Sequence, residues 1–177
     1  MIKQEDIYQN IIKLLNDSGA EYKLFEHRAA LTYQDLEELQ KETGFFGTEG
    51  KCMVLKTDNK ETLLPRSLES KFIVYVTTFG KKINFDLIKE KLGIGKIRLA
   101  TPEDLKEYFG AEPGCAYPFG FDKNILVFVD PKIYEEEWFL FSPLYPTKTI
   151  QVKGADLKKI FNNCGNKVTL VTSNSQV

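Results

Sequence analysis

Apolar side chains recur near helical spacing between residues 5 and 16, and Gly19 supplies a stop just beyond them. Later helices are indicated by capping sequences. Thr32 with Asp35 three positions on forms a capping box, and Thr101-Pro-Glu-Asp places a cap, a proline and two acids where a helix begins. Helices are therefore expected over residues 5–16, 33–42, 85–92, 102–110 and 155–162.

Short stretches rich in Val, Ile, Tyr and Phe predict β-strands, most clearly at residues 51–57 and 72–78. The polar stretch 58–70, which Pro65 interrupts, is expected to be a long hairpin loop, and residues 172–177 a polar tail. Further strands are expected over residues 22–25, 97–99, 125–129, 138–141, 148–152 and 167–171.

Helices scattered among antiparallel-compatible strands, without strict βαβ alternation, indicate a mixed α/β or α+β fold. We expect one domain over residues 1–177, with a curved, mostly antiparallel mixed sheet flanked by helices. The chain is long enough for one compact domain with a core, and too short for two comfortable ones.

One segment cannot be regular structure: Gly110-Ala-Glu-Pro-Gly-Cys-Ala-Tyr-Pro-Phe-Gly120. Glycine frees the backbone, whereas proline fixes φ and removes a donor. A loop of this composition holds a fixed shape and exposes backbone amides. It follows a predicted helix and precedes an apolar strand, a place where ligand contacts are common.

Composition narrows the classes of function. The formal net charge of -1 argues against a long nucleic-acid surface, so any such contact is expected to be small and local. The chain has three cysteines far apart, no CxxC pair and one histidine, His27. This pattern favours neither a disulfide framework nor a zinc site, and it predicts no metal and no cofactor.

The N-terminal residues are polar and lack the apolar core of a signal peptide. The longest apolar run, residues 72–79, is too short to span a bilayer. These two features predict a cytoplasmic protein that does not enter the membrane.

Six short landmarks then follow one another in a recognisable order. They are Phe25-Glu-His27, Gly50-Lys51-Cys-Met-Val-Leu-Lys56, Lys82-Ile-Asn-Phe-Asp-Leu87, Arg98-Leu-Ala-Thr-Pro-Glu-Asp-Leu105, Gly110-Ala-Glu-Pro-Gly114 with Pro118-Phe-Gly120, and Phe128-Val-Asp130. In this order and spacing, over nearly its full length, the chain resembles the YbaK/ProRS-associated family of aminoacyl-tRNA editing domains.

The resemblance implies the fold of that family and hydrolysis of the ester that links a wrong amino acid to tRNA, most often tRNA for proline. Because no synthetase sequence is attached, the chain resembles a free-standing trans-editing deacylase. The implied partners are the acceptor end of aminoacyl-tRNA and prolyl-tRNA synthetase. The key lysine of the family maps onto Lys51, and its Gly-x-x-x-Pro loop onto Gly114-Cys-Ala-Tyr-Pro118.

An aminoacyl ester is already labile, so a thousandfold acceleration needs only about 4 kcal/mol. A preorganised set of hydrogen-bond donors around an oxyanion supplies about 3–4 kcal/mol. The chain shows no Ser-His-acid motif, so we infer a bound water as nucleophile. The predicted catalytic residues are Lys51 and the loop amides of Gly114, Cys115 and Ala116. The predicted substrate-binding residues are Lys51, His27, Tyr117, Pro118, Phe119 and Gly120.

Other interpretations stay open. Lys51 is also compatible with a solvated lysine at a strand end, and the loop with a rigid connector, although we favour the functional interpretation of both. For the lone histidine, His27, the more usual role is that of a structural hydrogen bonder. The chain is also compatible with a non-catalytic module that binds tRNA, a synthetase or an amino acid, or with a hydrolase of another small acyl substrate. Phe141-Ser-Pro-Leu-Tyr-Pro146 replaces an asparagine-alanine-glycine turn of many relatives, so amino-acid specificity does not carry over.

Overall fold

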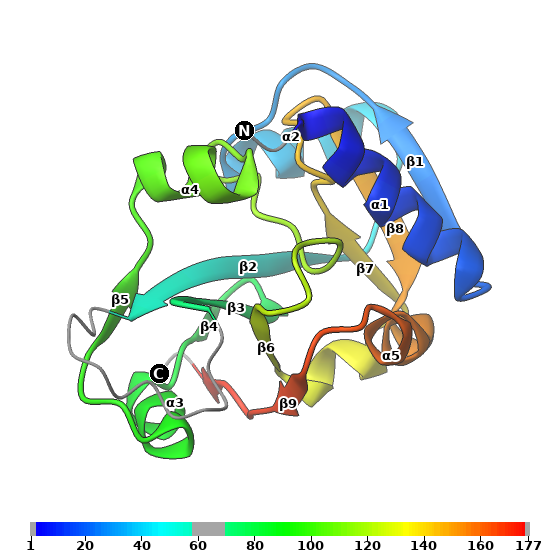
Figure 1. The fold of residues 1–177 in the computed structure, drawn as a ribbon. Helices are drawn as coiled ribbons and strands as arrows, with labels where there is room; N and C mark the ends of the chain where they lie inside the picture. The colour runs from blue at the N-terminus through cyan, green and yellow to red at the C-terminus, as the bar shows by residue number, and fades with distance from the viewer. Residues whose placement is uncertain (1–2, 58–69, 176–177) are drawn as a thin grey trace.

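The computed structural model describes residues 3–57 and 70–175, and its main feature is an eight-stranded mixed sheet (Figure 1). The strand order is β1-β8-β7-β2-β3-β6-β9, with β5 paired to β2 beside this path. The strands are β1 (Tyr22–Glu26), β2 (Thr48–Thr57), β3 (Phe72–Thr78), β5 (Ile97–Leu99), β6 (Leu126–Val129), β7 (Trp138–Phe141), β8 (Lys148–Lys153) and β9 (Val168–Leu170).

The long strand β2 joins the two halves of this sheet. Its first residues, Thr48 and Glu49, pair in parallel with β7, whereas residues 50–56 pair antiparallel with β3. The pairs β1–β8, β7–β8 and β2–β5 are antiparallel, and β3–β6 and β6–β9 are parallel. The predicted fold class, a mostly antiparallel mixed sheet flanked by helices, is confirmed.

Helices cover both faces of the sheet. They are α1 (Gln4–Asp17), α2 (Tyr33–Thr43), α3 (Phe85–Leu92), α4 (Pro102–Phe109), α5 (Gly154–Asn163) and the 3-10 helix η1 (Pro131–Glu135). In Figure 1, α4 and α3 lie on opposite sides of β2 and β3. No helix in the described ranges is both long enough and apolar enough to cross a membrane.

Strand β3 is buried on both faces, so the core has two main layers. Val74 and Val76 belong to the cluster that includes buried residues of α1 and α5. Ile73 and Tyr75 belong to the cluster that includes Ile88 of α3. Because successive side chains of a strand point to opposite faces, a continuous apolar run is what a strand covered on both sides requires.

The predicted starts of α2 and α4 agree with the structure because their caps are local. The Thr32 hydroxyl accepts from the Asp35 amide, and the Asp35 carboxylate accepts from the Thr32 amide. Thr101 and Asp104 repeat this capping box at the start of α4. Each such cap is worth about 1 kcal/mol.

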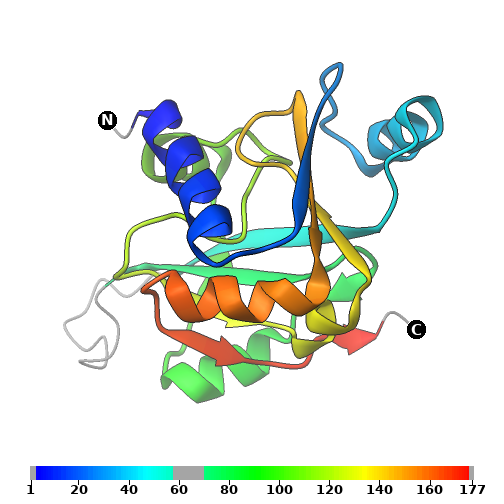
Figure 2. The same cartoon turned by 90° about the vertical axis from the view of Figure 1, so that its right-hand side faces the viewer.

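Three short elements were not predicted: η1, β4 (Lys81–Lys82) and β10 (Asn174–Ser175). The predicted polar tail, residues 172–177, contains the short strand β10, which pairs with β4 (Figure 2). Two-residue strands are too short to show a period. The predicted hairpin loop at residues 58–70 lies, apart from its last residue, outside the described residues.

A buried polar network ties residue 173 to the core, just before β10. The Ser173 hydroxyl donates to Thr77 Oγ1 over 2.9 Å and is also hydrogen-bonded to the Tyr75 hydroxyl. The Thr77 hydroxyl in turn donates to Asp130 Oδ2 over 3.1 Å. Every hydroxyl in this chain of contacts has a partner, so the network stabilises the position of the C-terminal segment instead of penalising its burial.

Candidate functional site

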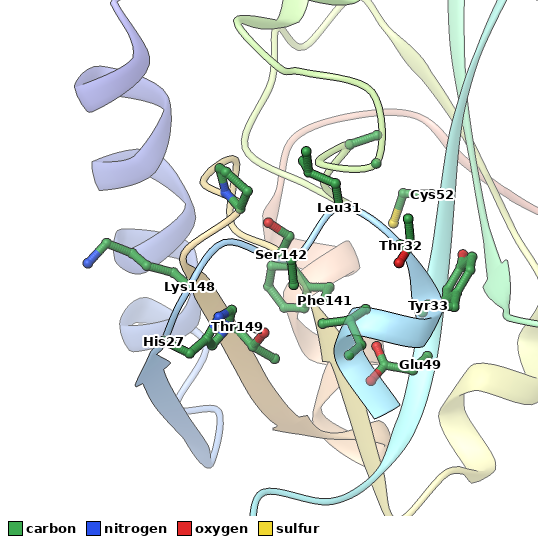
Figure 3. Close-up of a pocket in the computed structure, with 16 residues that line it drawn as sticks. His27, Leu31, Thr32, Tyr33, Glu49, Cys52, Phe141, Ser142, Lys148 and Thr149 are labelled. Atoms are coloured by element: carbon green, nitrogen blue, oxygen red, sulfur yellow. Dashed lines mark hydrogen bonds between the residues drawn. The ribbon is translucent and has the colours of Figure 1, made fainter. Parts of the chain in front are cut away.

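A cavity of about 100 Å³ lies where four segments converge (Figure 3). Residues from the end of β1 into the start of α2 form one wall, and the end of β7, the β7–β8 connection and the start of β8 form another. Three residues of β2 and two residues of the glycine-rich loop complete the lining. The residues that matter for the chemistry below are His27, Glu49, Cys52, Gly114, Ala116 and Ser142.

Gly50 forms part of the cavity lining at the point where β2 leaves β7. A Cβ atom there would lie 2.4 Å from Phe139 Cζ and 2.8 Å from the Leu140 carbonyl oxygen. Real Cβ atoms do not approach other atoms this closely, so only glycine lets β2 cross against β7. The cavity therefore depends on a close contact at Gly50, and nothing in the sequence distinguishes this glycine from the others.

Gly114 sets the approach of the loop to the segment before α2. It has φ of +87°, and a Cβ there would lie 2.7 Å from the Leu31 carbonyl oxygen. The Cys115 amide donates to the Glu112 carbonyl over 3.0 Å. Within residues 3–57 and 70–175, the amides of Gly114 and Ala116 have no hydrogen-bond acceptor. Two backbone donors at the cavity thus remain available to a bound molecule.

Buried side chains anchor this loop. The Tyr117 hydroxyl donates to the Phe109 carbonyl over 3.0 Å, and burial raises the pKa of that hydroxyl. The Phe119 ring is fully buried and packs edge-on against Phe141 and Phe161. Because these buried side chains fix the position of the loop, the backbone amides of Gly114 and Ala116 have a fixed geometry.

Three ionisable groups that line the cavity have pKa values shifted towards the neutral form. Lys148, which also lines it, is the opposite case, because its hydrogen bond to Glu26 raises its pKa and favours the charged form. Glu49 is largely buried and its carboxylate accepts from Gln40 Nε2 over 2.7 Å, but desolvation still raises its pKa to about 7. Burial raises the pKa of Tyr33 to about 12 and raises the pKa of the Cys52 thiol. A neutral thiol is a poor nucleophile, so Cys52 does not offer thiolate chemistry.

Replacing Glu49 with glutamine should change the pH dependence of stability. The folded-state pKa of about 7 lies above the ordinary 4.5, so the unfolded chain loses the proton first. The contribution to stability is therefore fully present below pH 4.5 and is lost as the pH rises to about 7. Glutamine still accepts from Gln40 and carries no charge. We expect E49Q to be more stable than wild type at pH 8, by up to about 3 kcal/mol.

Urea unfolding of both proteins at pH 5 and pH 8 measures this effect, because all other titrating groups are shared. The difference in free energy of unfolding between E49Q and wild type should grow from pH 5 to pH 8. Parallel pH profiles for the two proteins would show that the Glu49 carboxyl titrates normally.

His27 lines the cavity, yet both of its ring nitrogens are engaged. Nδ1 donates to the Arg28 carbonyl over 2.6 Å, since a carbonyl oxygen only accepts. Nε2 of the neutral ring then accepts from the Thr149 hydroxyl over 2.8 Å. This arrangement fixes the ring as part of the wall and leaves no free nitrogen to act as a base towards water.

The structure brings some of the predicted site residues together and separates others. His27, Gly114 and Ala116 lie at the cavity. Lys51 does not line it, because the side chain leaves the opposite face of β2 from Cys52 and its Nζ donates to the Lys81 carbonyl over 3.1 Å. The predicted residues that the structure places away from the cavity are Cys115, Tyr117, Pro118 and Phe119, which are buried, and Gly120, which packs against Ile11 of α1.

Sequence reasoning missed several lining residues, among them Tyr33, Glu49 and Thr149. Tyr33 was visible only as the start of a helix, and Glu49 lies before the predicted start of its strand. Ser142 lies within the residue 141–146 segment, which stood out as a departure from the family. Its hydroxyl donates to the Tyr145 carbonyl over 2.7 Å, so this turn does shape the cavity.

Comparison with known proteins places the chain among tRNA-editing proteins. The family model described as "aminoacyl-tRNA editing domain" matches residues 27–160. Among curated proteins, the multifunctional Ser/Thr-tRNA deacylase ProXp-y of Escherichia coli K12 is 21% identical over 161 residues, which cover 90% of this chain and 91% of that protein. The protein of the same name from E. coli O157:H7 matches equally well.

Two solved structures share the fold. A hypothetical protein superposes with a TM-score of 0.69 at 17% identity, over 93% of this chain and 99% of the other. A proposed trans-editing enzyme for prolyl-tRNA synthetase superposes with a TM-score of 0.68 at 15% identity, over 96% and 98%. At such low identity, these structures establish the common architecture.

Proposed function

The chain belongs to the aminoacyl-tRNA editing domain family and is an aminoacyl-tRNA deacylase, and from that premise we propose that it removes a small amino acid wrongly attached to tRNA for proline. The observation that carries this proposal is the small cavity whose lining includes Gly114 and Ala116, two residues whose backbone amides have no acceptor in the described part of the chain.

The reaction is hydrolysis of an ester, and the donors match its transition state. A water oxygen attacks the ester carbonyl carbon, and the carbonyl oxygen becomes an oxyanion that the Gly114 and Ala116 amides stabilise. The bond to the ribose oxygen then breaks, and that oxygen takes one proton of the water to become a hydroxyl. The second proton of the water is released to solvent, so the amino acid leaves as a carboxylate. Together, a preorganised pair of backbone donors of this kind is worth about 3–4 kcal/mol.

The size of the cavity supports a small amino acid. Its volume of about 100 Å³ lies well below the ~300–1,000 Å³ of pockets for drug-sized ligands. A site that admits only small side chains acts as the second sieve of an editing pair and leaves the larger, correct product intact. Phe141 and Pro146, which line the cavity, help to set this limit.

The position of Lys51 relative to the cavity indicates which part of the substrate it contacts. Lys51 lies outside the cavity, and we assign it a contact with a phosphate or ribose of the terminal nucleotide instead of the reacting ester.

The chain is near neutral overall, so its own affinity for tRNA should be modest. Prolyl-tRNA synthetase is therefore the protein partner that we propose, since it would supply mischarged tRNA directly.

A deacylation time course tests the proposal. Transfer RNA for proline is charged separately with alanine, cysteine, serine, threonine or proline and is incubated with the same concentration of enzyme. We expect rapid loss of at least one small amino acid and no loss of proline beyond the spontaneous rate. A folded protein that spares all five would contradict this substrate and favour a binding module of the same fold.

A further inference from the structure

Two aromatic rings, one partly buried and one exposed, stack at the cavity. The rings of Tyr33 and Phe79 lie 3.8 Å apart between centroids, with planes 28° from parallel. Tyr33 lines the cavity on the side opposite His27 (Figure 3). The Phe79 amide donates to the Glu49 carbonyl over 2.8 Å, so Phe79 is held beside another lining residue. Phe79 nevertheless remains 51% exposed.

Three lysines are connected to this stack through the backbone that follows Phe79. Lys81 and Lys82 follow Phe79 after one glycine, and Nζ of Lys51, on β2, donates to the Lys81 carbonyl. In the part of the chain that the structure describes, none of the three pairs with a carboxylate. An exposed ring backed by a second ring, with unpaired cations beside it, combines the two features that hold single-stranded nucleic acid.

We propose that Phe79, supported by Tyr33, is the platform on which the terminal adenine of tRNA stacks, with Lys51 and Lys81 neutralising the adjacent phosphates. This assignment rests on the proposed function, because the aminoacyl ester sits on the ribose of that same nucleotide. When the ester enters the cavity, the base is the part of the nucleotide that must lie just outside. The Phe79 ring is the exposed aromatic surface at that place.

The platform also explains how a chain of net charge -1 can bind RNA at all. Stacking is independent of charge and of base sequence, so it adds affinity where few cations are available. A contact limited to one base and its phosphates is the small, local interaction that the composition predicts.

The test uses a short RNA hairpin with a single-stranded CCA end in which 2-aminopurine replaces the terminal adenine. Stacking on an aromatic ring quenches 2-aminopurine fluorescence. We expect wild type to quench it, F79A to bind about tenfold more weakly or worse without quenching, and F79Y to restore both signals. F46A is the matched control, because Phe46 is 57% exposed and has no ring contact among the described residues.

The role of the lysines is tested by measuring how RNA affinity depends on salt concentration. Replacing Lys51 with methionine keeps the aliphatic stem, and the slope of log affinity against log salt should fall by about 0.7. K23M, an exposed position on β1, should leave the slope unchanged. An unchanged slope in K51M would contradict the proposed contact between Lys51 and a phosphate.

Binding and deacylation are measured separately, so the two proposals fail in different ways. Wild-type quenching without deacylation would contradict the proposed substrate and support the platform. Deacylation by wild type together with normal quenching and affinity in F79A would overturn the platform and leave the function standing. Because F79Y and F46A remove no buried group, loss of folding does not obscure either result.

Discussion

Replacing Gly114 with alanine is expected to lower kcat/KM for deacylation by about 100-fold in a protein that still folds. The added Cβ would lie 2.7 Å from the Leu31 carbonyl oxygen, so the loop must move away from the wall before α2. That movement displaces the free amides of Gly114 and Ala116 from the oxyanion. Both donors are lost together, because one rigid turn carries them.

Gly93→Ala is the matched control for this variant. Gly93 also has positive φ, +64°, but a Cβ there meets nothing within 4 Å, and the residue caps α3 away from the cavity. Both variants should lose a similar amount of stability from the positive φ, about 1 kcal/mol. Single-turnover rates with matched melting curves separate the effects. Activity of G114A within threefold of G93A would exclude the loop amides from the reaction.

Replacing Gly154 with alanine is expected to lower the free energy of unfolding by about 3 kcal/mol. Gly154 begins α5 and is buried against the segment that follows η1. A Cβ there would lie 2.1 Å from the Glu136 carbonyl oxygen and 2.7 Å from the Ile133 carbonyl oxygen. Both obstacles are backbone atoms, so no side-chain rotation relieves them. The helix and η1 must separate.

Thermal unfolding measures this loss, which corresponds to a fall in Tm of about 6–12 °C for a chain of this size. Gly95→Ala is the control, because a Cβ there meets nothing within 4 Å and Gly95 does not have positive φ. It should be neutral or slightly stabilising. If G154A and G95A have the same Tm, the contact between α5 and η1 is looser than the structure indicates.

Local signals explain why most elements were predictable from sequence. The capping boxes at Thr32 and Thr101 use side chains three residues apart, so the information lies within one turn. Strand β3 was recognisable because it is covered on both faces and therefore apolar throughout. Such signals do not depend on the rest of the fold.

The order of the strands and the exact site lacked such signals. The parallel pairing of β2 with β7 joins residues about ninety positions apart, and no periodicity encodes it. A period of two places Lys51 and Cys52 on opposite faces of β2, but it does not say which face meets the cavity. Buried apolar side chains in the glycine-rich loop likewise resembled ligand contacts, because Tyr117 and Phe119 look the same in a sequence whichever way they point.

The pairing of β1 with β8 constrains how the chain reaches its structure. Tyr22 lies opposite Val152, so this edge of the sheet cannot close until most of the polypeptide has been synthesised. The parallel pairs β3–β6 and β6–β9 also join strands that are far apart in the sequence, so the β9 edge of the sheet forms late as well. Chains dominated by such distant contacts fold slowly, on the order of milliseconds to seconds. A nascent chain that stops before residue 148 therefore leaves β1 without its partner, and we expect it to bind chaperones and remain inactive until β8 emerges.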